Sequence, residues 1–271
     1  MNPLVVVGIM VVAVALMVGL LYLMRRLVPT TGLLVDVGRA NALYGLVCTA
    51  FAVLLAFVVF VGFQSFNQGR SAAEREAVAV MELFRTAGFF PAPEGDVLQG
   101  QIACYARAAV REWRPMSDGR HSRVVDMWVG RMQRTWARLP LDSPTAQAAF
   151  SNLTAADDVR TTGRRERLAE RRAVVSTPVW FTLAVGGVIV VLTAVLYADP
   201  RERFVVQAFL LSAVTVMVVA GLVLVWFLDL PFEDSTGSIK STEMQRSIVE
   251  MEGENPGLPA LCSLSGRPVP A

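Results

Sequence analysis

The sequence predicts an all-α membrane protein, with four transmembrane helices and a helical cytoplasmic segment between the second and the third. Hydrophobic residues make up 54% of the 271 positions and charged residues only 18%, whereas soluble domains carry about 25% charged residues. The apolar residues are concentrated in four long runs, and most of the charge lies in one segment between them. Composition and its distribution along the chain therefore indicate the same class.

Each apolar run is long enough to cross a bilayer, which requires about 20 residues, and none contains Asp, Glu, Lys, Arg or His. Buried helices of soluble proteins rarely continue this far without a charge. The first run is interpreted as a retained span, because Arg25 and Arg26 follow it where a signal peptide has a small-residue cleavage site. The runs are Leu4–Met24, Ala42–Phe63, Ala173–Ala198 and Phe204–Leu228.

The spans divide the chain into four parts. A first transmembrane pair (residues 1–63) is followed by the helical cytoplasmic segment (64–172), a second transmembrane pair (173–229) and a cytoplasmic tail (230–271). The end of the tail is rich in Pro and Gly, so we expect the tail to be partly disordered.

Sidedness follows from the distribution of arginine. Four spans place both termini and the 64–172 segment on one side of the membrane. This segment holds 17 arginines, with a cluster just before the third span, and the positive-inside rule assigns such a segment to the cytoplasm. Arg25 and Arg26, on the opposite side, argue the other way.

The 64–172 segment carries signals for four helices. Ser71 and Glu74 have capping-box spacing and predict a helix start. Ser143 followed by Pro144 predicts another, as N-cap and first helical residue. Between them we expect helices over about Val97–Trp113 and Ser122–Leu139. The second of these places four large apolar residues on one face: Trp128, Met132, Trp136 and Leu139.

Residues suited to enzyme chemistry are scarce. The only histidine, His121, lies next to Ser122 and near Asp118 in one polar turn, which is not how a catalytic triad is assembled. A solvated loop histidine is the favoured interpretation. The sequence has no P-loop, dinucleotide-binding glycine pattern or His-Glu-x-x-His motif. Charges such as Glu76 in the helix after Ser71 are expected to form a solvated or interfacial face. We therefore expect no enzyme.

Cofactors, metals and nucleic acid are not expected either. Cys48, Cys104 and Cys262 show no metal-ligand spacing, so neither a zinc site nor a disulfide framework is predicted. The net charge of +2 does not suggest a nucleic-acid partner.

Among membrane functions, a channel is favoured over a transporter, because transporters place ionisable groups within the membrane and these spans have none. The second span passes directly into a vestibule-like polar stretch that includes Gln64, Asn67 and Arg70. An apolar constriction that opens into amides and arginine suits an inorganic anion. An alternative of equal weight is that the phenylalanines of this span face lipid or neighbouring helices, and that the amides mark only the membrane–water interface.

Four short motifs, in this order around the spans, resemble a bacterial family of bestrophin-like membrane proteins that is distantly similar to bestrophin anion channels. The resemblance covers about residues 42–244. Its motifs are Gly62-Phe63 continuing into a helix with Glu74, then Glu82-Leu-Phe-Arg85, Glu112-Trp-Arg-Pro-Met116, and Leu228-Asp-Leu-Pro-Phe-Glu-Asp234.

The resemblance implies a bestrophin-like fold, a ring-shaped homo-oligomer expected to be a pentamer, and a multi-pass protein of the bacterial inner (plasma) membrane, in contact with lipid. It implies passive conduction of anions through a central pore lined by the second transmembrane helix, with a neck at Leu55, Val59 and Phe63. Phe60 replaces Val59 if the register slips by one residue. The alternative is a non-conducting membrane scaffold or accessory subunit.

This sequence also departs from the bestrophin pattern. Ser71-Ala72-Ala73 stands where bestrophins have Arg-Trp-Trp, and the acidic cluster after the last span shrinks to Glu233-Asp234. Since calcium takes six to eight oxygen ligands, we expect no calcium requirement.

Overall fold

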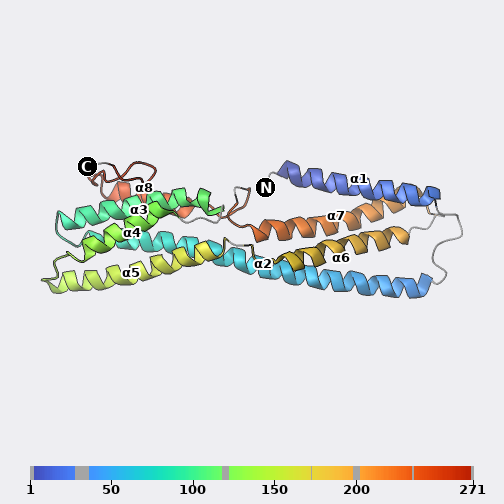
Figure 1. The fold of residues 1–271 in the computed structure, drawn as a ribbon, viewed down its shortest axis with the longest axis horizontal. Coiled ribbons are helices and arrows are strands. Elements are labelled where there is room, and N and C mark those ends of the chain that lie inside the picture. Colours follow the sequence, from blue (N-terminus) through green and yellow to red (C-terminus); the bar gives the residue numbers. More distant parts are fainter. Residues whose placement is uncertain are drawn as a thin grey trace. The chain divides into compact units, whose positions relative to one another are not determined.

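The computed structural model is all-helical over the residues that it describes, which are 3–27, 37–117, 122–171, 173–197, 202–233 and 235–269 (Figure 1). Within these ranges the chain forms no strand beyond an isolated bridge between Cys262 and Pro268. The Asp118–His121 turn lies outside them. The helices are α1 (Pro3–Leu27), α2 (Val37–Ala87), α3 (Glu94–Ser117), α4 (Arg123–Trp136), α5 (Pro144–Ala169), α6 (Thr177–Leu196), α7 (Phe204–Asp229) and α8 (Thr242–Glu254).

The chain forms two units. Unit 1 comprises residues 1–65, 173–230 and 234–237, and unit 2 comprises residues 66–172, 231–233 and 238–271. Helix α2 is continuous, and its residues up to Ser65 belong to unit 1.

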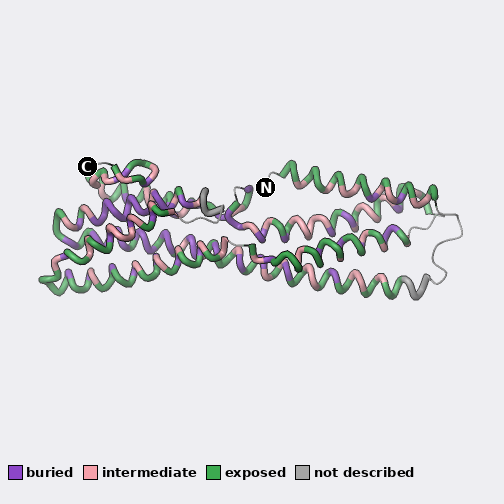
Figure 2. Tube along the Cα trace, viewed as in Figure 1, coloured by how far each residue is buried: buried purple, intermediate pink, exposed green. Residues whose placement is uncertain are grey.

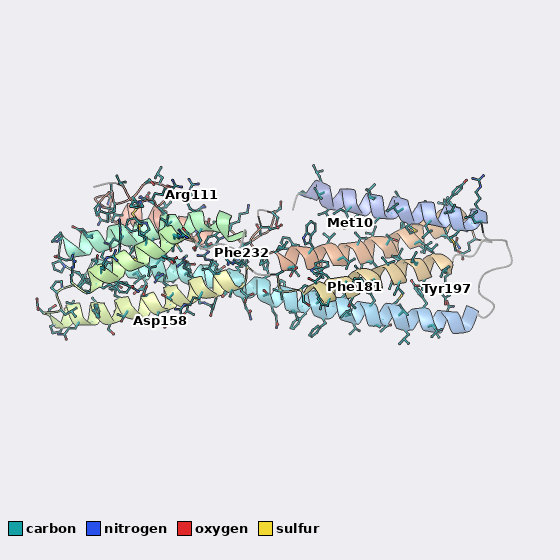
Figure 3. The ribbon with its side chains drawn as sticks, viewed as in Figure 1. Met10, Arg111, Asp158, Phe181, Tyr197 and Phe232 are labelled. Atoms are coloured by element: carbon teal, nitrogen blue, oxygen red, sulfur yellow. A yellow bond between two sulfur atoms is a disulfide. The ribbon has the colours of Figure 1, made fainter. Side chains whose placement is uncertain are left out.

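Unit 1 contains α1, α6, α7 and the first part of α2. All four helices are long and apolar enough to cross a membrane, as the sequence predicts. α1 packs against α7, and α6 against both α1 and α7. Phe51 and Val58 of α2 join a buried cluster with Leu183 of α6 and Val225 of α7. Many apolar side chains point outward instead, such as Phe181 on α6 (Figure 3), and exposed residues recur along all four helices (Figure 2).

Two buried polar side chains, Asp229 and Gln207, join helices of unit 1 by hydrogen bonds. Asp229, the last residue of α7, is buried. Its carboxylate accepts hydrogen bonds from the amide nitrogen of Val175 (2.7 Å) and from Nε1 of Trp180 (3.1 Å), which tie the end of α7 to the start of α6. At another point Nη2 of Arg25 donates to Oε1 of Gln207 at 2.6 Å, joining α1 to α7.

Unit 2 is a helical bundle with its own apolar core. The predicted face is confirmed for Trp128, Met132 and Trp136, which lie on α4 and belong to or pack against this core, whereas Leu139 joins the core from beyond the end of the helix. Ser143 caps α5 as predicted, its hydroxyl accepting a hydrogen bond from the amide of Ala146.

Two local expectations in the middle segment and tail are wrong. No helix begins at Ser71, because α2 runs through this position and leaves the capping box inside a continuous helix. The tail contains an unforeseen helix, α8, whose Met244 and Met251 enter the core of unit 2. α8 packs along α3.

The expectation that the cysteines form no disulfide is also wrong, because Cys104 of α3 and Cys262 of the tail form one. The two residues are 158 positions apart in the sequence, and only the docking of the tail on α3 brings them together. The Pro/Gly-rich end, expected to be partly disordered, is described as far as Val269, and the carbonyl oxygen of Gly266 accepts a hydrogen bond from Nε1 of buried Trp128 at 2.7 Å.

Candidate functional site

One side of α2 packs inside unit 1. Leu55 and Val59, two of the predicted neck residues, are half-buried against the cluster shared with α6 and α7. Leu55 lies so close to Gly221 of α7 that a Cβ there would be 2.6 Å from its Cδ2. Gly62 similarly lies against Leu228. The packed side of α2 thus includes part of the predicted neck.

Exposed aromatic rings lie on α2 beside this packed side. Phe57, Phe60 and Phe63 are 65%, 57% and 53% exposed, and Gln64 directly after them is exposed as well. Phe60 and Phe63 are both predicted neck residues. The structure therefore separates the four candidates into an open pair, Phe60 and Phe63, and a half-buried pair, Leu55 and Val59.

In unit 2, the polar continuation of α2 has mixed charge. Asn67 and Arg70, the other predicted vestibule residues, are exposed, and Nε of Arg70 binds the carboxylate of Glu74 at 2.9 Å. Arg75 pairs with Glu166 of α5. A groove of about 590 Å³ lies here, lined by Asn67, Gln68, Ser71, Arg75, Glu166 and Glu170. Carboxylates offset the arginines, so this surface is less cationic than the sequence suggests.

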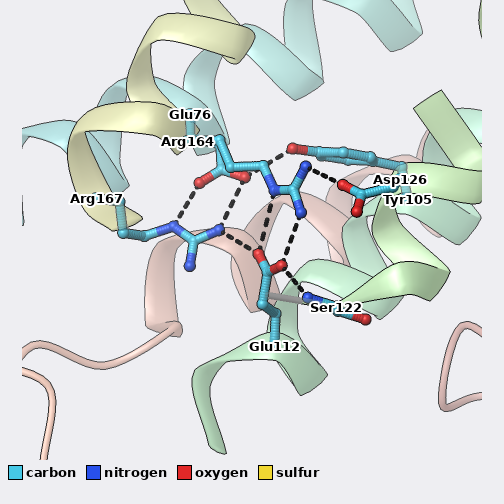
Figure 4. A network of polar contacts seen from close by, with 7 residues as sticks. All are labelled: Glu76, Tyr105, Glu112, Ser122, Asp126, Arg164 and Arg167. Atoms are coloured by element: carbon cyan, nitrogen blue, oxygen red, sulfur yellow. Dashed lines mark hydrogen bonds and ion pairs between the residues drawn. The ribbon is translucent and has the colours of Figure 1, made fainter. Parts of the chain in front are cut away.

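The same stretch of α2 supplies a buried ion-pair network (Figure 4). Glu76 is fully buried and accepts from Nε of Arg167 at 2.6 Å. Arg167, also fully buried, donates from Nη2 to Glu112 at 3.0 Å. Its guanidinium lies 4.2 Å from the ring centre of Trp113. One arginine of α5 therefore links a carboxylate of α2 to a carboxylate of α3.

Further donors satisfy the remaining carboxylate oxygens. Arg164 binds Glu112 at 2.7 Å and Asp126 of α4 at 2.8 Å. The hydroxyl of Tyr105 donates to Glu76 at 2.7 Å, and the amide of Ser122 donates to Glu112 at 2.8 Å. Burial alone would raise the pKa of Glu112, but the hydrogen bond from Arg164 and the charges of Arg167 and Arg164 lower it. The network holds α2, α3, α4 and α5 together.

Sequence reasoning missed this network, because Glu76 was expected on a solvated face. The spacing of apolar residues around Glu76 indicated that it lies on the buried side of the helix. Residues three and four positions from Glu76 in both directions are apolar and buried: Ala72, Ala73, Ala79 and Val80. Residues at these spacings share a face of a helix, so Glu76 belongs to the buried side and requires a partner there.

Metal ligands do not gather in the described ranges, where no cluster of three His, Cys, Asp or Glu residues could hold an ion. Asp234, part of the acidic pair after the last span, lies outside those ranges.

Comparison with known proteins agrees with this architecture. A family model described as a Bestrophin-like domain matches residues 4–237, and no curated protein matches the chain. Two crystal structures of single-site variants of a bacterial bestrophin homologue from Klebsiella pneumoniae have TM-scores of 0.64 and 0.67. Both are 15% identical and cover 92% and 91% of this chain and 98% of their own.

A crystal structure of a membrane protein is equally similar. It has a TM-score of 0.68 at 15% identity and covers 92% of this chain and 98% of its own. At this identity the similarity establishes a shared fold.

Proposed function

Because the chain belongs to the bestrophin-like domain family, which includes anion channels, we propose that it forms a homo-oligomeric, pentameric channel of the bacterial inner membrane. Anions pass down their gradient through a central pore lined by α2. The neck is formed by Phe60 and Phe63, together with the half-buried Leu55 and Val59.

The observation that carries this proposal is the exposed aromatic side of α2. Three phenylalanines lie exposed on a helix that also packs other side chains against α6 and α7, and an amide side chain, Gln64, follows directly. A ring of such helices would place an apolar constriction next to hydrogen-bond donors. Apolar constrictions gate by dewetting, and amide and guanidinium donors stabilise a partly dehydrated anion. Gln64, Asn67 and Arg70 then form the vestibule.

One specific observation favours a second candidate, a non-conducting membrane scaffold. The arginines near the proposed vestibule are paired, Arg70 with Glu74 and Arg75 with Glu166. Such pairing weakens the attraction of the vestibule for anions. Under this alternative the exposed phenylalanines contact lipid or neighbouring helices.

Planar-bilayer recording of the purified protein across a salt gradient decides between the two functions. A channel gives current whose reversal potential lies toward the equilibrium potential of the anion. A correctly assembled oligomer that stays electrically silent would support the scaffold.

A further inference from the structure

The C-terminal segment 255–269, here called the strap, is the last part of unit 2 and is tied to α3 by one disulfide. Cys262 of the strap pairs with Cys104 of α3, and their Cα atoms are 5.8 Å apart. This distance lies in the range that disulfides occupy without backbone movement. The bond is therefore compatible with the strap as it is docked.

Besides the hydrogen bond from buried Trp128 to the carbonyl oxygen of Gly266, the strap buries few apolar side chains. Leu258 and Leu261 are only half-buried against the core. Close approach occurs at two glycines: a Cβ at Gly266 would lie 2.4 Å from the amide nitrogen of Ala108, and one at Gly100 would lie 2.8 Å from Pro259. Segments with few buried apolar side chains open at low free energy, so the covalent bond has a large share in keeping the strap docked.

Asn255, the first residue of the strap, is held in place by hydrogen bonds to the helices. Its Nδ2 donates to Oε1 of Gln99 at 2.9 Å, and Nε2 of Gln99 donates to the carbonyl oxygen of Phe84 at 3.1 Å. These bonds do not depend on the cysteines. Opening of the strap is therefore expected to start after Asn255 and to leave α8 in place.

A cation lies beside one sulfur. Nη1 of Arg107 is 3.6 Å from Sγ of Cys262, and its Nη2 binds Glu252 of α8 at 2.7 Å. A guanidinium next to sulfur stabilises the thiolate, which is the nucleophile of thiol–disulfide exchange. The surroundings of Cys262 thus favour a bond that can be broken and formed again.

We propose that Cys104 and Cys262 are a reversible redox site that docks the strap when oxidised and releases it when reduced. The proposal rests on a cytoplasmic unit 2, as the arginine count predicts, because the bacterial cytoplasm keeps thiols reduced and its disulfides are mostly regulatory. The reductant is a protein or small molecule with two thiols, and the oxidant is a low-molecular-weight disulfide.

The exchange balances in two steps. A thiolate of the reductant attacks Sγ of Cys262, which is 6% exposed against 1% for Cys104, and the Cys104 thiolate leaves and takes up a proton. The second thiol of the reductant then displaces Cys262 and closes the reductant's own disulfide. Two electrons and two protons pass to the cysteine pair. In the reverse direction the Cys262 thiolate attacks a sulfur of the oxidant and releases its first thiol. The Cys104 thiolate then attacks Sγ of Cys262 in the mixed disulfide and releases the second thiol.

Hydrogen exchange on the full chain in detergent tests strap release. A Cys48→Ala background removes the one other cysteine, which is unpaired. Dithiothreitol should raise amide exchange over residues 258–269 at least about tenfold while α8 keeps its protection. The Cys104→Ser variant should exchange at the fast rate with or without reductant. Equal strap exchange in oxidised and reduced protein would overturn the proposal.

Thiol trapping in intact cells tests whether the switch operates. Acid quenching and alkylation should find the pair mostly reduced during growth and oxidised after treatment with a disulfide-forming oxidant. A pair that stays oxidised, or stays reduced, in both conditions excludes a switch. Neither readout depends on current, so a silent bilayer would reject the channel function alone.

Discussion

At the scale of single residues, the position of Phe63 connects the structure of α2 to its proposed function. Its ring is exposed although other residues of the same helix are buried in unit 1. Leaving apolar surface in water costs about 25 cal/mol per Å². An exposed aromatic ring next to Gln64 therefore suits a surface that is covered by lipid, by a neighbouring subunit or by a closed apolar ring.

Replacing Phe63 by Ala should raise conductance if the ring closes the neck. The substitution removes an aromatic ring from every subunit at once, so the radius grows on all sides. A barrier lowered by about 1 kcal/mol gives roughly fivefold more current. Single-channel recording in planar bilayers measures this, with exposed Phe181→Ala on α6 as the control.

Phe63→Arg should shift the reversal potential further toward that of the anion, because it places a ring of positive charge in the path. If wild type and both variants are silent in intact oligomers, the channel function fails and the scaffold is preferred.

Glu76 is expected to contribute strongly to stability. Removing one partner of a buried ion pair leaves an uncompensated charge and costs about 3–5 kcal/mol. Glu76→Gln should lower the free energy of unfolding of unit 2 by about 3 kcal/mol, since the amide still accepts one hydrogen bond. Thermal unfolding in detergent measures the loss.

The matched control is Glu82→Gln, because Glu82 lies on the same helix and is exposed. Its effect should stay within about 0.5 kcal/mol. Equal effects of the two substitutions would show that the network of Glu76 adds no stability.

At the scale of elements, the contact of α2 with α5 depends on one glycine. A Cβ at Gly163 would lie 3.0 Å from the carbonyl oxygen of Ala72 and 3.0 Å from the amide nitrogen of Glu76. Both neighbours are backbone atoms of α2, which cannot rotate away. The close approach of the two helices also allows Arg167, one turn further along α5, to reach Glu76.

Gly163→Ala should therefore destabilise unit 2, although alanine favours helix by up to about 1 kcal/mol over glycine. Overpacking costs about 1–3 kcal/mol, so we expect a net loss. Gly130→Ala on α4 should instead raise the free energy of unfolding by about 1 kcal/mol. The nearest atom to the added Cβ would be 3.6 Å away, at the end of the Arg134 side chain. If thermal unfolding shows that Gly163→Ala stabilises unit 2, α2 and α5 can move apart without a cost in stability.

Elements were predictable where one local signal dominates. The four spans follow from long uncharged runs, and the start of α5 follows from Ser143 and Pro144. The helix start at Ser71 was wrong, because a capping box raises the probability of a helix start but does not interrupt a helix that continues. α8 and the Cys104–Cys262 pair were missed because long-range packing on α3 creates them. The neck and vestibule residues of α2 stay predictions.

At the scale of the whole molecule, two features point to opposite sides of the membrane. The arginine count predicts a cytoplasmic 64–172 segment, whereas a disulfide in unit 2 is more typical of an oxidising compartment. Arg164 and Arg167 are buried in ion pairs in the folded state. They are charged during membrane insertion, however, which precedes this packing. We therefore give the arginine count precedence.

A reporter inserted after Pro140, between α4 and α5, tests the side. A reporter enzyme that is active only in the periplasm should be inactive when inserted at this position. A fluorescent protein that folds only in the cytoplasm should fluoresce when inserted there. Periplasmic activity would reverse the proposed topology and make the disulfide a permanent one.

Assembly is the second prediction at this scale. Small residues allow helices to approach closely in membranes, and Gly45, Ala52 and Ala56 of α2 are exposed. Native mass spectrometry should find one stable oligomer with the mass of five chains. Ala56→Trp should weaken it by blocking this approach, and Phe181→Ala should not. Monomers alone from the unmodified protein would contradict the proposed assembly.

The buried ion-pair network also restricts how this sequence can drift in evolution. Loss of either Glu76 or Arg167 alone leaves a buried charge without its partner, so an intermediate with one change is penalised. Replacement of the charges together by apolar side chains of similar volume is often neutral or stabilising. Positions 76, 112, 164 and 167 should therefore change as a group among descendants of a common ancestor, and an alignment in which they vary independently would contradict this expectation.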